Sequence, residues 1–304
     1  MIYTITVNPA IDYVIEMTEL ELGEVNRTEN YHFLAGGKGI NVSQILNQLQ
    51  LENIAWGFVG GFSGTELTRQ VAAKDIKSDF VEIADQTRIN VKLNAGQETE
   101  INGAGPKITA AEFEQFKDKL KNLNEGDTVV MSGSLTPSLP DNFYQSLIPA
   151  IKEQGADFVV DTTGQALLDT LEYEPLVIKP NHHELADLFD TTFANDDELV
   201  AAARKLLDQG AKHVLISMAG DGGYLITKDH VYQANAAKGT VVNSVGAGDS
   251  MVAGFVGTFA KTKDPVESFK VGMACGGATT FTKDIANAAQ IAEILPQIEV
   301  TKIS

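Results

Sequence analysis

The sequence has little cysteine, few basic residues and no long apolar run. Its single cysteine, Cys275, excludes an internal disulfide within the 304 residues. Lys and Arg total 23 against 41 Asp and Glu, and the net charge of −18 disfavours nucleic acid and anionic membranes as partners. The most apolar late stretch, residues 251–260, is about half of a membrane-spanning length, so we expect no transmembrane helix. No basic, apolar leader opens the chain, and we expect a cytoplasmic protein.

Strand-like runs and helical patterns alternate along most of the chain. The runs that favour β-structure are residues 2–7, 128–131, 158–161, 176–179, 213–217 and 224–227. Apolar residues recur at helical spacing at 42–49, at 113–123 behind a Thr109/Glu112 capping box, and at 199–207. This alternation predicts one α/β domain over residues 1–304, with helices on both faces of a mainly parallel sheet. Ligands of such sheets bind beyond the carboxyl ends of the strands.

Two segments interrupt this alternation, at about residues 12–34 and 88–103. The second has the pattern of a hairpin, with a turn at residues 94–97. Together they predict a small, discontinuous β-sheet that closes over a substrate as a lid. Apolar positions such as Val14, Ile15 and Tyr31 would be exposed on this sheet in a monomer, so we expect two lids to pair in a homodimer.

The sharpest chemical feature is the segment 243–250, NSVGAGDS, which follows the β-rich run 240–242 and opens a helix. Its small residues let the N–H groups of a helix start approach phosphate oxygens closely. Asp249 would lie beside this anion hole, where a carboxylate can accept the proton of an attacking hydroxyl. The alternative is that Asp249 only caps a helix after a tight turn, and spacing alone leaves both open.

A second glycine-rich segment, residues 35–41 with the sequence AGGKGIN, runs directly into the helix at 42–49. Its glycines allow a ligand close to the backbone, and the Asn41 amide can bind sugar hydroxyls; an ordinary turn with a solvated Lys38 is the alternative. The segment is not a Walker A loop, which needs Gly-Lys followed by Ser or Thr. No Gly-x-Gly-x-x-Gly follows the first strand, which disfavours a dinucleotide-binding dehydrogenase.

Together the two loops resemble the signature regions of ribokinase-like carbohydrate kinases with phosphofructokinase B type motifs. Further family-like stretches occur in the expected order at residues 8–12 (NPAID), 132–135 (SGSL) and 179–184 (KPNHHE). The resemblance spans nearly the whole chain and implies a ribokinase-like three-layer α/β/α fold with a β lid. Residues 87–92 (TRINVK) and 23–27 (GEVNR) are most similar to the branch that phosphorylates fructose 1-phosphate at its 6-hydroxyl.

The resemblance also implies ATP and Mg²⁺ as cofactors and a role for each matching residue. The catalytic set is the base Asp249 with an anion hole formed by the amides of Gly246, Ala247 and Gly248. The set that binds the sugar hydroxyls and the substrate phosphate is Asp12, Gly37, Lys38, Asn41, Arg88, Asn90 and Arg27, the last of these in reach of a neighbouring subunit's site. The nucleotide-binding set is Lys179, Ser217, Gly220, Asp221, Gly222 and Gly248. Asn181 and Glu184 would hold Mg²⁺ through water.

The chain departs from the family pattern at two places. Ala219 stands where relatives often have the first glycine of the nucleotide loop, and its methyl group would alter the backbone's approach to the ligand. Asn243 and Ser244 replace a more usual Asp or Ser followed by Thr, so the resemblance assigns their side chains no role. Neither departure involves Asp249.

Two other functions stay open from the sequence. One is a kinase of the same class with a different acceptor, tagatose 6-phosphate above all. The other is a sugar or nucleotide sensor that keeps the fold without catalysis. The adjacent His182 and His183 do not share a helix face and have no third partner at suitable spacing, so we do not expect them to bind a metal.

Overall fold

A computed structural model describes residues 1–304, and a mainly parallel sheet lies at its centre. Five parallel strands follow the order β10-β9-β1-β4-β5, and β6 pairs with the far end of β4. Their bounds are β1 Ile2–Thr6, β4 Asn53–Val59, β5 Lys77–Ser78, β6 Val81–Glu82, β9 Thr128–Ser132 and β10 Asp157–Asp161. Strands β1 and β9 are wholly buried, as expected of strands covered on both faces.

A second sheet continues the first toward the C-terminal half. Its antiparallel strands are β11 Val214–Ser217, β12 Gly223–Ile226, β13 Val231–Ala234 and β14 Val300–Lys302. The extended segment 176–179 joins the two sheets: the N–H of Leu176 donates to the carbonyl of Phe158 in β10, and the carbonyl of Ile178 accepts from Leu215 in β11, both at 2.9 Å. The strand-like run predicted there therefore links the sheets by single bridges and forms no full ladder.

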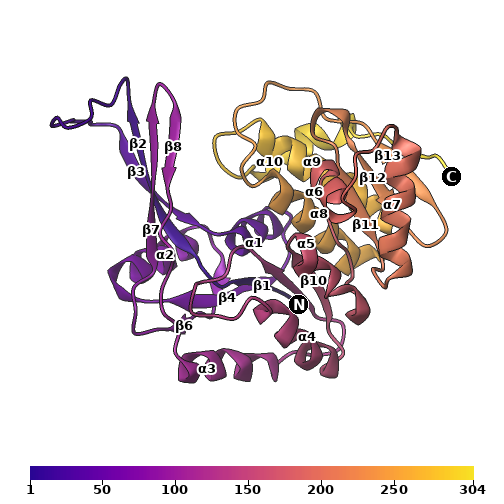
Figure 1. Ribbon diagram of the computed structural model, residues 1–304, viewed down its shortest axis with the longest axis horizontal. Helices are drawn as coiled ribbons and strands as arrows, with labels where there is room; N and C mark the ends of the chain where they lie inside the picture. Colours follow the sequence, from indigo (N-terminus) through magenta and orange to yellow (C-terminus); the bar gives the residue numbers. More distant parts are fainter.

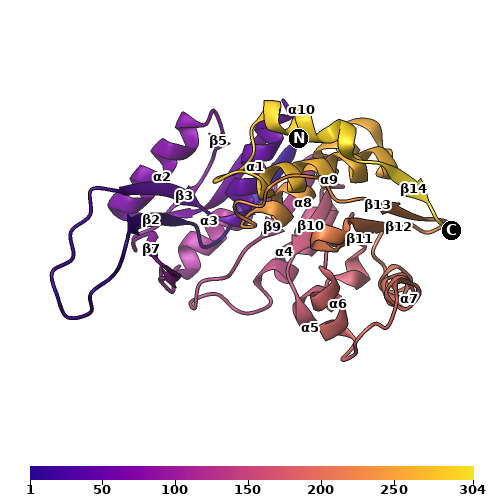
Figure 2. The same ribbon diagram turned by 90° about the horizontal axis from the view of Figure 1, so that it is seen from above.

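Helices cover both faces of the joined sheets (Figures 1 and 2). Their bounds are α1 Lys38–Gln48, α2 Gly61–Ala73, α3 Ala110–Leu120, α4 Phe143–Glu153, α5 Gly164–Leu168, α6 His182–Leu188, α7 Asp196–Asp208, α8 Ala247–Thr262, α9 Pro265–Thr280 and α10 Ala288–Ile294. One apolar cluster fills the space beneath α1, α8, α9 and α10, and two others lie beneath α3 and α4 and beneath α5 to α7. The three-layer α/β/α fold expected from the sequence is confirmed.

Local sequence explains where the key helices begin and how they pack. Thr109 and Glu112 form the predicted capping box of α3. Asp264 accepts from the N–H groups of Val266 and Glu267, so α9 starts immediately after α8 ends. The two helices approach closely because Gly254 has no side chain: a Cβ there would come within 2.8 Å of the Gly272 Cα. Cys275 is buried in this contact, as a small packed residue.

The predicted lid is a four-stranded sheet that stands away from the body of the molecule (Figure 1). Its order is β3-β2-β7-β8, with β2 Ala10–Met17, β3 Tyr31–Gly36, β7 Arg88–Ala95 and β8 Glu98–Ile101. The hairpin β7–β8 is confirmed, and β2 pairs with β7 in parallel. One expectation was wrong: Val14 is 9% exposed and faces the site cavity, because it lies on the same face of β2 as Asp12.

Two further findings concern the β-rich run 240–242 and the apolar content of the helices. The β-rich run 240–242 forms no strand, because its only backbone partner is the Thr280 carbonyl at the end of α9, and Val241 and Val242 are exposed. No helix has both the length and the apolar content that a bilayer crossing requires.

Candidate active site

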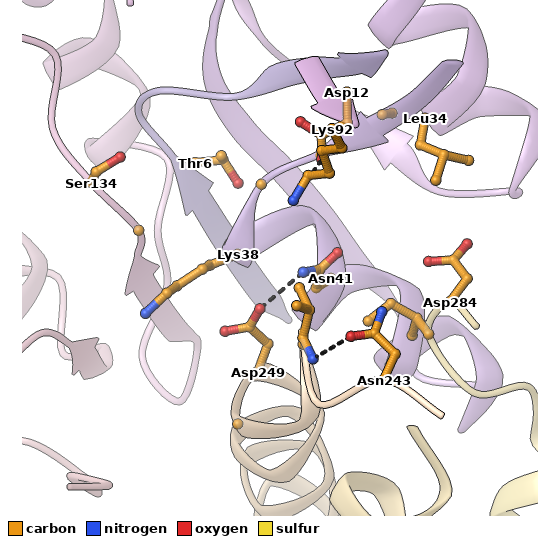
Figure 3. A pocket seen from close by; sticks show the side chains of 18 of the residues that line it. Thr6, Asp12, Leu34, Lys38, Asn41, Lys92, Ser134, Asn243, Asp249 and Asp284 are labelled. Atoms are coloured by element: carbon orange, nitrogen blue, oxygen red, sulfur yellow. Dashed lines mark hydrogen bonds and ion pairs between the residues drawn. The ribbon is translucent and has the colours of Figure 1, made fainter. Parts of the chain in front are cut away.

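A cavity of about 920 Å³ lies between the lid and the carboxyl ends of the parallel strands. The end of β1, the start of α1, the start of α8 and the inner face of the lid all contribute to its walls. Figure 3 shows Asp12 and Lys92 on the lid side, Asp249 opposite them, and Asn41 between. The parallel topology places these loops together, as the sequence predicted.

Asp249 is a buried acid in the first turn of α8, with 6% of its surface exposed. The side-chain amide of Asn41 donates a hydrogen bond to Asp249 Oδ2 at 2.9 Å. Burial raises the pKa of the Asp249 carboxyl to about 6, with a further contribution from the negative charge of Asp161. An acid with this pKa is largely ionised at pH 7 and still binds a proton readily, which suits a general base.

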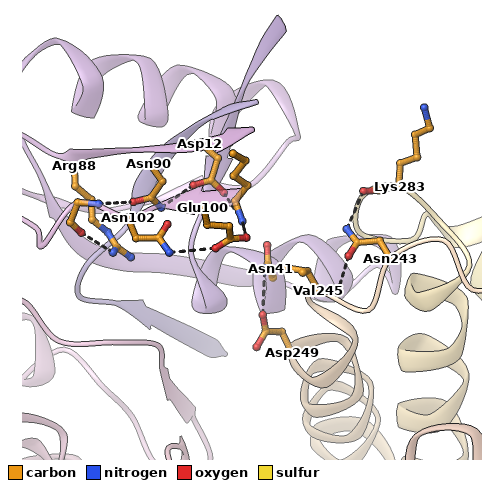
Figure 4. Close-up of polar contacts among 12 residues, drawn as sticks. Asp12, Asn41, Arg88, Asn90, Glu100, Asn102, Asn243, Val245, Asp249 and Lys283 are labelled. Carbon is orange, nitrogen blue, oxygen red and sulfur yellow. Dashed lines mark hydrogen bonds and ion pairs between the residues drawn. The ribbon is translucent and has the colours of Figure 1, made fainter. Parts of the chain in front are cut away.

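The start of α8 leaves the amides of Gly246 and Gly248 without a partner in the protein, whereas the Ala247 N–H donates to the Ser244 carbonyl at 3.3 Å. Gly246 has φ 79°, a left-handed conformation that glycine adopts without strain, and no side chain caps the helix. The side chain of Asn243 shapes the preceding turn: Oδ1 accepts from the Val245 N–H at 2.9 Å, and Nδ2 donates to the Lys283 carbonyl at 3.3 Å (Figure 4). Asn243 thus has a structural role here.

Two lysines share one partly buried carboxylate on the Asp249 side of the cavity. Asp161, at the end of β10, lies 3.1 Å from Lys38 Nζ and 3.8 Å from Lys179 Nζ. Although burial opposes ionisation of Asp161, the ammonium groups of Lys179 and Lys38 lower the pKa of its carboxyl. Lys179 Nζ also lies 3.1 Å from the point where a Cβ on Gly248 would stand. The arrangement therefore holds positive charge beside the start of α8.

The lid supplies the polar groups on the other side of the cavity. Asp12 Oδ1 accepts from Asn90 Nδ2 at 2.8 Å, and Asn90 Oδ1 in turn accepts from the Gly103 N–H at 3.1 Å (Figure 4). Burial raises the pKa of Asp12, and the Asn90 hydrogen bond lowers it in part. Arg88 donates to the carbonyls of Asn8 and Gly103, so its guanidinium ties the lid to the loop after β1.

The glycine-rich loop before α1 fits closely over β1. Gly37 has φ 145°, and a Cβ there would come within 2.5 Å of Thr6 Cγ2. Thr6 lines the cavity, and its buried hydroxyl has no hydrogen-bond partner in the protein. The Oδ1 atom of Asn8 is likewise buried without a partner. A Cβ on Gly39 would come within 2.5 Å of Thr6 Oγ1, and one on Gly105 within 2.3 Å of Asn8 Oδ1, so both polar atoms face closely packed backbone.

The predicted nucleotide loop lies outside this cavity. Gly220 and Asp221 line a second hollow of about 550 Å³, next to the segment 233–238. Ala219 has φ 49°, a left-handed conformation that costs a residue with a Cβ roughly 1–2 kcal/mol. The first-glycine position of this loop thus has the backbone conformation of a glycine and the side chain of an alanine.

Asn181 and Glu184 bind each other's backbone. Asn181 Oδ1 accepts from the Glu184 N–H at 2.9 Å, and Glu184 Oε2 accepts from the Asn181 N–H at 2.8 Å, which caps α6. Glu184 lines the main cavity and Asn181 does not. No three His, Cys, Asp or Glu side chains are grouped to ligate a metal directly.

Most of the residues singled out from the sequence line the main cavity. They are Asp12, Gly37, Lys38, Asn41, Arg88, Lys179, Glu184, Gly246, Gly248 and Asp249. Those outside its wall are Arg27, Asn90, Asn181, Ser217, Gly220, Asp221, Gly222 and Ala247. Arg27 is exposed on the connection between β2 and β3, so the structure does not bring it to the site of its own chain.

Sequence reasoning missed Asp161 and Lys92, which both line the cavity. Asp161 ends a strand-like run, and the rule that ligand-binding groups follow parallel strands was the signal available for it. Lys92 lies two residues beyond Asn90 on the same face of β7, so strand alternation was the signal for this residue.

Comparison with known proteins agrees with this geometry. The family described as pfkB family carbohydrate kinase matches residues 5–291 of the chain. The chain therefore belongs to the pfkB family of carbohydrate kinases, and this membership implies ATP as the phosphoryl donor.

Individual relatives match over full length. The chain is 43% identical to a 1-phosphofructokinase of Bacillus subtilis over 303 residues, 100% of both chains. It is 36% identical to a D-tagatose-1-phosphate kinase of Bacillus licheniformis and 35% identical to a tagatose-6-phosphate kinase of Staphylococcus epidermidis, again over 100% of each. The tetrameric inhibited form of phosphofructokinase-2 from Escherichia coli superposes with a TM-score of 0.89 at 27% identity, over 97% of this chain and 98% of that one.

Proposed function

We propose that this kinase transfers the γ-phosphoryl group of ATP to the 6-hydroxyl of D-fructose 1-phosphate, giving fructose 1,6-bisphosphate and ADP. The observation that carries the proposal is Asp249, a buried base beside an uncapped helix start, facing sugar-binding groups across one cavity. The similarity to 1-phosphofructokinases over the full chain supports this acceptor.

In the proposed reaction, O6 of the sugar attacks the γ-phosphorus while the bond between that phosphorus and the β–γ bridging oxygen breaks. Asp249 accepts the hydroxyl proton, and Asn41 orients the carboxylate. The amides of Gly246 and Gly248, at the positive end of α8, stabilise the charge on the phosphoryl oxygens, and the Ala247 N–H joins them when it exchanges the Ser244 carbonyl for a phosphoryl oxygen. ADP leaves with the electron pair of the broken bond.

The remaining residues bind and orient the two substrates. Asp12, held by Asn90, accepts hydrogen bonds from sugar hydroxyls near Gly37. Lys38 and Arg88 contribute positive charge for the anionic sugar. Lys179 and the loop that contains Ser217, Gly220, Asp221 and Gly222 bind the nucleotide, and the hollow beside Gly220 is consistent with this.

The acid groups fit a Mg²⁺ ion that arrives with the nucleotide. Glu184 has one carboxylate oxygen outside its capping box, and this oxygen can hold such an ion through water, with Asn181 keeping Glu184 in place. When bound, the ion neutralises charge on the nucleotide phosphates.

We also propose a homodimer formed through the lid. The outward face of the lid carries an aromatic group in which Tyr13 stacks on Phe33 at 4.7 Å between ring centroids, with Tyr31 against it edge-on. Tyr31, Phe33 and Ile101 are 55%, 47% and 63% exposed, an apolar surface that a second lid would cover. In such a dimer, Arg27 would reach the neighbouring subunit's site.

The test of the reaction is ADP release with ATP and Mg²⁺ across fructose 1-phosphate, tagatose 1-phosphate, tagatose 6-phosphate, fructose 6-phosphate and fructose. We expect the highest kcat/KM with fructose 1-phosphate. A higher value with a tagatose phosphate would favour the second candidate, which the relatives of that name support. ATP binding without turnover of any sugar would favour a sensor.

A further inference from the structure

The inner face of the lid is built from alternate residues of its strands. On β2 and β7, Asp12 and Val14 lie opposite Asn90 and Lys92 in register. Side chains two positions apart on a strand share a face, so Asp12, Val14 and Lys92 all line the cavity. Lys92 is therefore a cation placed directly beside the carboxylate proposed to hold sugar hydroxyls.

Lys92 is held in the cavity by two carboxylates. Its Nζ lies 2.7 Å from Glu100 Oε1 and 3.9 Å from Asp12 Oδ2. Asn102 fixes Glu100 by donating to its other oxygen at 3.1 Å. The Lys92 side chain is 21% exposed, and Figure 3 shows its amine extending from the lid into the cavity.

The other cations in the cavity wall are committed elsewhere. Lys38 and Lys179 share Asp161, on the Asp249 side. The Arg88 guanidinium makes three contacts with the carbonyls of Asn8 and Gly103. Lys283 extends away from Asp249 (Figure 4). Lys92 is the cation on the lid side whose only close partner is a partly exposed carboxylate.

The geometry of a hexose phosphate selects the lid side for the phosphate group. The acceptor hydroxyl must reach Asp249, and in fructose 1-phosphate the phosphate is at the opposite end of the carbon chain. With the ring hydroxyls bound between Asn41 and Asp12, that end would point away from Asp249 toward the lid, and Figure 3 shows Asn41 between Asp249 and the lid residues Asp12 and Lys92. The amine of Lys92 is in this position.

We propose that Lys92 is a substrate-binding residue that contacts the phosphate group of the sugar and so selects phosphorylated over plain sugars. This rests on the proposed function in taking a sugar phosphate as the substrate. Glu100 holds the amine in place until the substrate arrives, and the phosphate then replaces Glu100. Such an exchange is feasible because the ion pair is partly open to solvent, with Glu100 36% exposed, and because a phosphate dianion offers more charge and more acceptor oxygens than the carboxylate does.

The test is calorimetric titration of fructose 1-phosphate, fructose and inorganic phosphate into the nucleotide-free protein. We expect Lys92→Met to weaken fructose 1-phosphate binding by about 10- to 100-fold, the value of a hydrogen bond to a charged group, and to leave fructose binding unchanged. Lys92→Arg should stay within a few-fold of the wild type. Lys121→Met, which removes the same charge from an exposed ion pair on the surface, is the control for the overall field and should bind normally.

A second variant tests the inference if Lys92→Met does not fold. Glu100→Gln removes the competitor of the phosphate, so we expect fructose 1-phosphate to bind equally or a few-fold more tightly. Weaker binding in Glu100→Gln, normal binding in Lys92→Met, or an equal loss for fructose would each overturn the inference, as would a wild-type protein that binds neither phosphate ligand. A protein that binds fructose 1-phosphate through Lys92 but releases no ADP would refute the proposed function alone.

Discussion

Asn41 and Asp249, 208 positions apart in sequence, meet in a 2.9 Å hydrogen bond at the junction of α1 and α8. This contact joins the two glycine-rich loops, because Asn41 follows one of them and Asp249 follows the other. It leaves the second carboxylate oxygen of Asp249, which accepts no hydrogen bond from the protein, available to an acceptor hydroxyl.

Replacing Asp249 by Asn should lower kcat by about 10²- to 10⁴-fold, because the amide cannot accept the hydroxyl proton. KM for the sugar should change little, since Asn retains the size and the contact with Asn41. Steady-state kinetics measures both. Near-normal turnover in this variant would show that another group is the base.

The same substitution should stabilise the protein at pH 7. The folded-state pKa of Asp249, about 6, exceeds its ordinary value of 3.8, so the folded protein binds this proton more tightly than the unfolded chain does. The stabilising contribution is complete below about pH 4 and is lost as the pH rises through 6. We expect Asp249→Asn to raise Tm at pH 7 and to have little effect on Tm near pH 4. A lower Tm at pH 7 would indicate that the variant loses activity through misfolding.

Turnover should fall as the pH drops through about 6, because the base must be ionised. Asp161→Asn removes a negative charge that raises the pKa of Asp249, so the acid limb of the kcat/KM profile should move to lower pH. Asp157→Asn is the matched control, since Asp157 begins the same strand and pairs with Lys212 on the surface. An unmoved limb in Asp161→Asn would contradict the electrostatic coupling between the two acids.

Much of the fold was predictable from the sequence, because local patterns determine it. The 3.6-residue spacing located α1, α3 and α7, and the interruption of the βα alternation located the lid. The β-rich run 240–242 forms no strand, because β-propensity measures fit to a sheet and no neighbouring strand pairs with it. The contacts of Asp161 with Lys38 and Lys179 were not predictable, since they depend on which strands are neighbours in the sheet.

The candidate site, like the fold, was only partly predictable from the sequence. The glycine loops stand out by their spacing, whereas the role of Asp249 as a base came from the family resemblance, because spacing alone fits a helix cap equally well. The hydrogen bonds of Arg88 to backbone carbonyls were not predictable, because nothing in the sequence distinguishes an arginine that binds a ligand from one that binds the backbone. Lys92 was recoverable only by following strand alternation from Asn90.

We expect a single charge on the outer face of the lid to disrupt the proposed homodimer. Phe33→Glu places a carboxylate in the aromatic group on the outer face, so we expect light scattering to report a monomer where the wild type is a dimer. Phe62→Glu is the control, because Phe62 is 69% exposed on α2, outside the lid. A monomeric wild type at micromolar concentration would contradict the proposed dimer.

Ala219→Gly should relieve backbone strain in the nucleotide loop. The left-handed cost of about 1–2 kcal/mol, offset by the greater freedom of glycine in the unfolded chain, leaves a gain of roughly 0.5–1 kcal/mol in unfolding free energy. KM for ATP should fall a few-fold as the backbone approaches the nucleotide. Gln50→Gly, at φ 56° after α1, should give a similar gain in urea unfolding without changing that KM. A destabilised Ala219→Gly protein would show that the loop is not strained.

The central claim is phosphoryl transfer to the 6-hydroxyl of fructose 1-phosphate, and ³¹P NMR of the product tests it directly. With ATP, Mg²⁺ and fructose 1-phosphate, we expect one new phosphomonoester signal coupled to the C6 protons, appearing in step with ADP and absent with Asp249→Asn. Inorganic phosphate in place of that signal, or a phosphoryl group on another carbon, would contradict the account.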